Sequence, residues 1–199
     1  MVSVCHGQTI FLKFGPAFSK LSYTSTTCQV SQQESIIGYD AIAGINYLNF
    51  KYFHLSSGFG FIQKGGIENY EIFQNDPRWV TETARLNFLT INTTFNLKVP
   101  ILQIIEPYIF VGPRLDYLIS YSENDHLLKD FNYFKVLNKV IYGIITGGGI
   151  NFKVKSFQLG LVFDYYLNVN KLVDIKTDYT TNQISDNTFT INACFGYKF

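Results

Sequence analysis

The feature that most constrains the fold is a period-two alternation of apolar and polar side chains, which is clearest over residues 188–199. Odd positions from Phe189 to Phe199 carry Phe, Ile, Ala, Phe, Tyr and Phe. Even positions from Thr188 to Lys198 carry Thr, Thr, Asn, Cys, Gly and Lys. Side chains on a β-strand point alternately to opposite faces. The segment is therefore predicted to be a strand with one aromatic face and one polar or small face.

Seven earlier segments show the same alternation and are predicted to be strands as well. The eight predicted strands are 8–19, 37–48, a third that follows the turn at 49–51 and ends near 63, 85–99, 106–121, 140–152, 157–169 and 188–199. The connections between them alternate between long and short. The four long ones, at 20–35, 64–83, 122–139 and 170–187, are polar and are predicted to be loops.

Composition indicates where such strands are placed. Hydrophobic residues make up 47% of the 199 residues, aromatic residues 17% and charged residues only 16%, against roughly 25% charged in ordinary soluble domains. No apolar run approaches the roughly 18 residues of a membrane helix. A membrane admits only helices and closed barrels, because every backbone amide needs an internal partner. The sequence therefore predicts an all-β fold, an eight-stranded antiparallel up-and-down transmembrane β-barrel with short turns on the periplasmic side.

The barrel is predicted to occupy residues 8–199 as one domain. Residues 1–7 are expected to be the remnant of a signal peptide or a disordered N-terminus; lipid attachment at Cys5 is an alternative that its sequence context fits poorly. The three cysteines show no metal-ligand spacing, so no cofactor is expected. The net charge of +1 and the lack of a basic run give no reason to expect nucleic acid as a partner.

Four segments resemble a known family. They are G-F-G-F-I-Q-K-G-G at 58–66, L-N-F-L-T-I-N at 86–92, P-Y-I-F-V-G-P-R-L-D-Y-L at 107–118 and G-Y-K-F at 196–199. They resemble the PorT-like outer-membrane β-barrel domain of Bacteroidetes, and the resemblance covers nearly the whole chain from Gln8. It implies the barrel fold and location in the outer membrane. One branch of that family is tied to a secretion system for surface proteins, while most members have no assigned role.

The last strand also resembles the closing strand of bacterial outer-membrane barrels, whose terminal aromatic residue belongs to the signal read by the insertion machinery. The resemblance assigns that signal to Phe195, Tyr197 and Phe199. The partners it implies are outer-membrane lipid and the barrel-insertion machinery.

Charged side chains collect on the face opposite the apolar one. The predicted lumen charge network consists of Lys13, Asp40, His54, Lys98, Arg114, Asp116 and Asp164. An eight-stranded barrel is just wide enough for side chains to fill its interior, and buried charges must pair because unpaired burial costs several kcal/mol. A structural network that plugs the lumen is the favoured interpretation, and a narrow gated pore is the alternative.

The sequence also leaves two alternatives, a lipid-modifying barrel enzyme and a soluble ligand-binding barrel. A lipid-modifying barrel enzyme needs a base or nucleophile at the outer rim, and His126 near Ser122, Glu123 and Asp125 is the candidate group. Such residues on one polar loop are more often simply solvated. A soluble ligand-binding barrel would need the apolar face inside, where its Phe, Tyr and Leu side chains leave no cavity.

The segment 64–83 is the candidate binding loop. It carries Tyr70, Phe73, Arg78 and Trp79, and Tyr, Trp and Arg are enriched in binding hot spots. The sequence therefore favours an integral outer-membrane barrel without enzymatic activity. Its loops are expected to bind a protein or glycan partner of the envelope, or to support the envelope or a secretion system.

Overall fold

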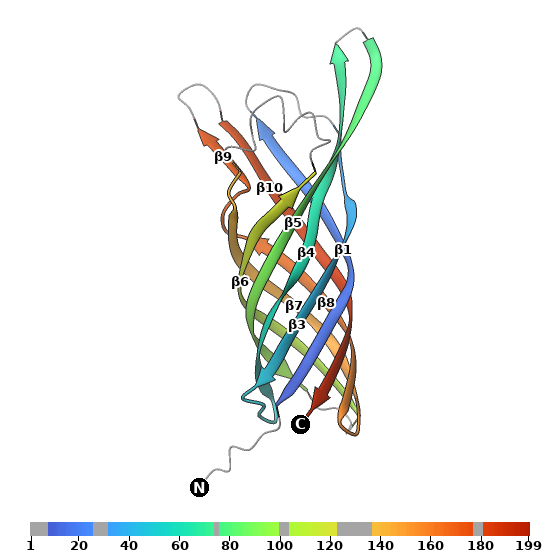
Figure 1. Ribbon diagram of the computed structural model, residues 1–199, viewed down its shortest axis with the longest axis vertical. Coiled ribbons are helices and arrows are strands. Elements are labelled where there is room, and N and C mark those ends of the chain that lie inside the picture. Colours follow the sequence, from blue (N-terminus) through green and yellow to red (C-terminus); the bar gives the residue numbers. More distant parts are fainter. Residues whose placement is uncertain (1–7, 26–31, 74–75, 100–103, 123–136, 177–180) are drawn as a thin grey trace.

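The strands follow directly from the alternation of side chains. The computed structural model describes residues 8–25, 32–73, 76–99, 104–122, 137–176 and 181–199. None of these residues is helical, so the described chain holds no helix long and apolar enough to cross a membrane. The strands are β1 (Thr9–Ser25), β2 (Gln32–Glu34), β3 (Ile36–Tyr47), β4 (Phe53–Phe73), β5 (Asp76–Lys98), β6 (Ile105–Tyr121), β7 (Val140–Val154), β8 (Phe157–Asn168), β9 (Val173–Lys176) and β10 (Thr181–Lys198) (Figure 1).

Eight of these strands form a closed barrel. Each pairs antiparallel with the next in the order β1, β3, β4, β5, β6, β7, β8 and β10, and β10 pairs back onto β1. The short strands β2 and β9 add to β4 and β10, respectively. The predicted eight-stranded antiparallel barrel is confirmed, including the seal between its first and last strands.

The outer surface of the barrel carries the apolar face of every strand. Aromatic side chains on this face stack between neighbouring strands, with ring centroids 4.9 Å apart for Phe18 and Phe189 and 6.1 Å apart for Phe14 and Phe195. The intervening positions, such as Lys13, are buried in the interior. Apolar outside and polar inside is the arrangement of a barrel embedded in lipid.

The two ends of the barrel differ in their connections. The short-turn end carries the connections at 48–52, 99–104 and 155–156, and the start of β1 and the C-terminus lie near it (Figure 1). The opposite end, the long-loop end, carries the extended β4–β5 hairpin and the long connection 122–139 between β6 and β7. Lys155 lies in the two-residue turn between β7 and β8 with φ of 55°, a conformation that such tight turns require.

The predicted limits of four strands, β1, β4, β5 and β10, are wrong at the long-loop end. β1 continues to Ser25, β4 and β5 extend through most of 64–83, and β10 begins at Thr181 instead of near 188. The segment 64–83 was predicted to be a loop, but it is a β-hairpin paired from Gly65↔Arg85 to Glu71↔Trp79. Beyond the lipid a strand needs no apolar face, so its side chains lose the alternation that marks a strand in the sequence. Figure 1 shows this hairpin (green) rising above the rest of the rim.

Candidate functional site

All seven residues of the predicted lumen network lie inside the barrel. Lys13, Asp40, His54, Lys98, Arg114, Asp116 and Asp164 are each no more than 7% exposed. Five of them belong to two clusters that lie at different levels along the barrel axis. His54 and Lys98 lie apart from both clusters, near the short-turn end.

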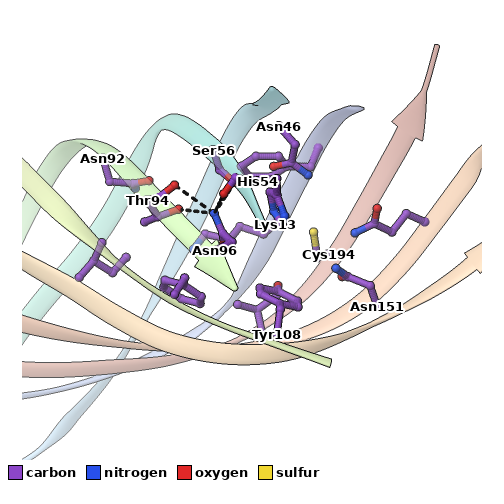
Figure 2. Close-up of a pocket in the computed structure, with 15 residues that line it drawn as sticks. Lys13, Asn46, His54, Ser56, Asn92, Thr94, Asn96, Tyr108, Asn151 and Cys194 are labelled. Carbon is purple, nitrogen blue, oxygen red and sulfur yellow. Dashed lines mark hydrogen bonds between the residues drawn. The ribbon is translucent and has the colours of Figure 1, made fainter. Parts of the chain in front are cut away.

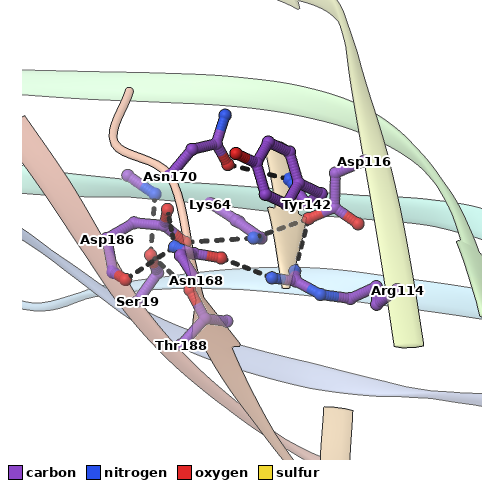
Figure 3. A network of polar contacts seen from close by, with 10 residues as sticks. Ser19, Lys64, Arg114, Asp116, Tyr142, Asn168, Asn170, Asp186 and Thr188 are labelled. Carbon is purple, nitrogen blue, oxygen red and sulfur yellow. Dashed lines mark hydrogen bonds and ion pairs between the residues drawn. The ribbon is translucent and has the colours of Figure 1, made fainter. Parts of the chain in front are cut away.

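The outer charge cluster consists of Lys64, Arg114, Asp116 and Asp186 (Figure 3). The ammonium of Lys64 donates to Asp116 at 2.8 Å and to Asp186 at 3.0 Å, and Arg114 donates to Asp116. Asn168 joins the cluster by accepting from Arg114 and donating to Asp186. Each charge in the cluster therefore faces an opposite one, which offsets the cost of burial.

Aromatic rings surround the cations of this cluster. The Lys64 ammonium lies 5.3 Å from the ring centroid of Phe88 and 5.4 Å from that of Tyr166. The Arg114 guanidinium lies 4.7 Å from the Tyr166 centroid. Because Phe88 and Tyr166 are themselves fully buried, these contacts fill the lumen at this level.

The middle charge cluster consists of Lys13, Asp40, Asp164 and Asn192. Lys13 donates to both oxygens of Asp164 at 2.7 and 2.8 Å. The Asn192 amide donates to Asp164 at 2.8 Å and to Asp40 at 3.1 Å, and Thr190 donates to Asp164 at 2.9 Å. The Asn192 amide therefore joins the carboxylates of Asp40 and Asp164, and Asp164 in turn pairs with Lys13.

An apolar layer closes the lumen toward the long-loop end. Its buried side chains are Leu21, Leu86, Leu118, Ile141, Leu172, Val173 and Ile184. Together with the two charge clusters, this layer fills the half of the lumen nearer the long loops with close-packed side chains.

The half of the lumen nearer the short turns is hollow and polar (Figure 2). An inner cavity of about 50 Å³ ends at Lys13 and Cys194, and a mouth cavity of about 110 Å³ opens at the short-turn end. The two cavities share the side chains of Asn46, His54 and Gln158. On one wall, Asn96 donates to Ser56 at 2.9 Å and to Thr94 at 3.1 Å.

Sequence reasoning missed three charged residues of the lumen: Lys64, Glu106 and Asp186. Lys64 and Asp186 fell within segments predicted to be loops, and Glu106 was placed at a strand end without a role. Each has an even residue number, as do the inward-facing residues of the strand that carries it. Extending the alternation of β4 by one more inward position finds Lys64, and extending that of β10 backward finds Asp186.

Other candidate residues fall outside the lumen. Phe195, Tyr197 and Phe199 are exposed at the short-turn end, where the Phe199 amide donates to the carbonyl of Gln8 at 3.1 Å. Tyr70, Phe73, Arg78 and Trp79 lie in the backbone of the β4–β5 hairpin, and their side chains are outside the described part of the structure. His126, Glu123 and Asp125 also lie outside the described residues. Where side chains are described, they form no group of three or more potential metal ligands.

Comparison with known proteins identifies the family. The family model for the outer membrane protein beta-barrel domain matches residues 8–174, which is most of the chain. The chain belongs to this outer-membrane β-barrel family. No curated protein matches the sequence significantly.

Solved structures show the same fold. The outer membrane protein OprG from Pseudomonas aeruginosa is similar with a TM-score of 0.60 and 11% identity, covering 97% of this chain and 96% of that one. Neisserial surface protein A is similar with a TM-score of 0.52 and 12% identity, covering 96% and 97%. At these identities the likeness concerns the fold alone. Family and fold together place the protein in the outer membrane.

Proposed function

We propose that this protein is a non-enzymatic outer-membrane barrel that presents the β4–β5 hairpin outside the cell to a protein or glycan partner. The observation that carries the proposal is the length of that hairpin. β4 has 21 residues and β5 has 23, whereas a strand needs only about 9–11 residues to cross the membrane. Half of each strand is therefore left to form a platform beyond the lipid.

The orientation of the barrel directs this platform outward. Outer-membrane barrels place their short turns in the periplasm and their longer loops outside the cell. The hairpin rises from the long-loop end (Figure 1). Its sequence carries Tyr70, Phe73, Arg78 and Trp79, which include the residue types that contribute most to binding interfaces.

The filled lumen supports a role at the surface over a role in transport. The apolar layer and both charge clusters occupy the outer half of the interior, so the described residues leave no continuous water path from end to end. This arrangement argues against the narrow pore. The four segments that resemble the PorT-like family suggest that the partner belongs to the envelope, in a secretion system or in its support.

The hairpin can be removed above the Ile67–Thr83 pair, a change that also removes Glu68 and Asn69, which pair with β2. Ile67 and Thr83 are paired opposite each other, so replacing residues 68–82 by Asn-Gly joins them through a two-residue turn of favoured type. We expect the wild type to cross-link to a partner and to support surface adhesion, and we expect cells that carry this variant to lose both. The measurement is chemical cross-linking of intact cells followed by mass spectrometry of the barrel, alongside a cell-adhesion assay.

A second variant separates the hairpin's side chains from its backbone. Y70A/F73A/R78A/W79A keeps the length of the hairpin and removes its large side chains, and it is expected to lose the partner as well. Heat-modifiable gel migration checks that both variants are folded barrels. If both fold and keep the same partner and adhesion, the hairpin is not the binding element.

The absence of enzymatic activity is tested at His126. In the proposed function, cells that express His126→Ala have the same lipid A profile as cells that express the wild type. A lipid A species that disappears only in the variant would assign the protein to the lipid-modifying enzymes instead.

A further inference from the structure

The mouth cavity at the short-turn end has an unusual charge distribution. Lys98, Lys153, Lys155 and Lys198 line it, and Glu106 is the one carboxylate among its described lining residues. With His54 neutral, these side chains give the lining a formal charge of +3. Elsewhere in the lumen each cation is matched by nearby carboxylates, so this excess is confined to the mouth.

Glu106 engages only two of the four lysines. Its Oε2 atom lies 2.5 Å from the ammonium of Lys153 and 3.8 Å from that of Lys98. Lys98 also donates to the side-chain oxygen of Asn49. Within the described residues, Lys155 and Lys198 form no ion pair. Lys155 and Lys198 are exposed at the mouth and add two positive charges that Glu106 does not contact.

Buried polar atoms behind the lysines also lack partners. Nδ1 of His54, which is 94% buried and borders both cavities, has no hydrogen-bond partner among the described residues. The same is true of Nδ2 of Asn92 and Oδ1 of Asn151 in the inner cavity. Figure 2 shows His54, Asn92 and Asn151 around the inner cavity. A buried polar group without a partner is costly unless water or a ligand satisfies it.

We propose that the mouth cavity is a binding site for a phosphate group. The excess of lysines, the two lysines without ion pairs and the unpartnered His54 all border the same small cavity. Lysine ammonium groups are common phosphate ligands because they act as compact point charges with rotatable donors. A cavity of about 110 Å³ admits a single tetrahedral oxyanion with a few waters and is too small for a folded segment of a protein.

The position of the site determines which phosphates reach it. The mouth opens at the short-turn end, which faces the periplasm, and the filled outer half of the lumen separates it from the cell exterior. The phosphate group therefore comes from the periplasmic side. It is supplied either by a free phosphate or by the headgroup of a lipid in the inner leaflet at the barrel rim.

The test uses the purified full chain in octyl glucoside micelles, with inorganic phosphate as the probe and chloride to hold the ionic strength constant. Binding is measured by ³¹P NMR line broadening. Wild type is expected to broaden the phosphate resonance saturably. K155Q/K198Q is expected to weaken binding about tenfold or more, because it removes two of the four positive charges that line the cavity. These lysines have no ion pairs to lose, so the variant is expected to fold.

A matched control carries the same change in net charge. K20Q/K51Q also removes two exposed lysines, one of them at the short-turn end, but neither lines the cavity. It is expected to bind phosphate as the wild type does. Glu106→Gln is expected to bind phosphate more tightly, since it raises the formal charge of the lining. The site is ruled out if the folded wild type does not broaden the phosphate resonance. It is also ruled out if both double variants weaken phosphate binding equally.

Two further measurements distinguish the sources of the phosphate group. In nanodiscs of phosphatidylglycerol, a site filled by lipid headgroups no longer binds inorganic phosphate, whereas a site for free phosphate keeps its affinity. Loss of the hairpin leaves phosphate binding unchanged, because the two features lie at opposite ends of the barrel. Failure of this site therefore does not bear on the proposed role of the hairpin.

Discussion

The ammonium of Lys64 lies 2.8 Å from Oδ2 of Asp116 on β6 and 3.0 Å from Oδ2 of Asp186 on β10. One side chain from β4 thus ties together two strands that do not neighbour β4 or each other in the barrel wall. All three side chains are no more than 1% exposed. The interior therefore braces the barrel across its diameter, in addition to the hydrogen bonds that run around its wall.

Lys64→Met is expected to destabilise the barrel strongly. Asp116 keeps Arg114, but Asp186 loses its buried cation, and breaking a buried pair costs about 3–5 kcal/mol of the free energy of unfolding. Urea unfolding in micelles measures the loss. Asp186→Asn added to Lys64→Met is expected to recover most of it. Exposed Lys20→Met serves as the control and changes the stability by less than about 0.5 kcal/mol. Equal stability of Lys64→Met and wild type would show that the brace contributes nothing.

Gly112 is expected to tolerate no larger side chain. A Cβ atom at this position would lie 1.9 Å from the carbonyl oxygen of Thr93 and 2.7 Å from the Cα atom of Thr94, so the backbone of β5 would have to move. Gly112→Ala is expected to lower the free energy of unfolding by about 1–3 kcal/mol. At Gly196 the nearest atoms are side-chain carbons at 3.1 and 3.3 Å, so Gly196→Ala is the milder control. The reverse ranking of the two variants would contradict the packing described for β5 and β6.

Because the lumen is filled, we expect the protein to conduct no ions across a membrane. The wild type, reconstituted in a planar lipid bilayer, is expected to show no stepwise conductance, because the apolar layer and the outer charge cluster occupy the outer half of the interior. Water in an apolar constriction is also unfavourable. Regular conductance steps from purified, folded protein would support the alternative that the barrel is a narrow pore.

The terminal aromatic residues are expected to act in membrane insertion. Phe199→Ala is expected to lower the amount of protein in the outer membrane and to leave the stability of the inserted barrel nearly unchanged, since Phe199 is 60% exposed. Phe157→Ala, an equally exposed aromatic at the same end, controls for the loss of an apolar surface group. The measurement is quantitative immunoblotting of membrane fractions. Unchanged abundance of Phe199→Ala would remove this residue from the signal.

The sequence was most informative where the chain lies in lipid. Contact with lipid on one side and a polar lumen on the other imposes a strict alternation, so β3, β6 and β8 were predicted to within one or two residues of their observed limits. The alternation breaks at Phe88-Leu89, and there the register of β5 against β6 shifts between Asn87 and Phe88.

The predicted strand limits were wrong beyond the lipid, where nothing imposes the alternation of apolar and polar side chains. The outer parts of β4, β5 and β10 extend beyond the length of strand that the lipid requires, so their outward positions need not be apolar and these parts were predicted to be loops. The same error hid Lys64 and Asp186. Pairings across the lumen, such as Lys13 with Asp164, depend on the diameter and stagger of the barrel, and the composition of single strands does not contain that information. The mouth cavity was missed for the same reason, because its four lysines come from three separate strands and a turn.

The seal between β1 and β10 has a consequence for the order of folding events. Thr9 pairs with Lys198 and Ser25 with Asn182, so the contacts that close the barrel join residues from opposite ends of the chain. Until that pairing forms, β1 and β10 each present a free edge that invites pairing with other chains. Contacts of such high contact order form late and slowly. The unclosed chain is thus the species most exposed to aggregation, and a chaperone that covers either free edge would act at the stage where this protein is most vulnerable.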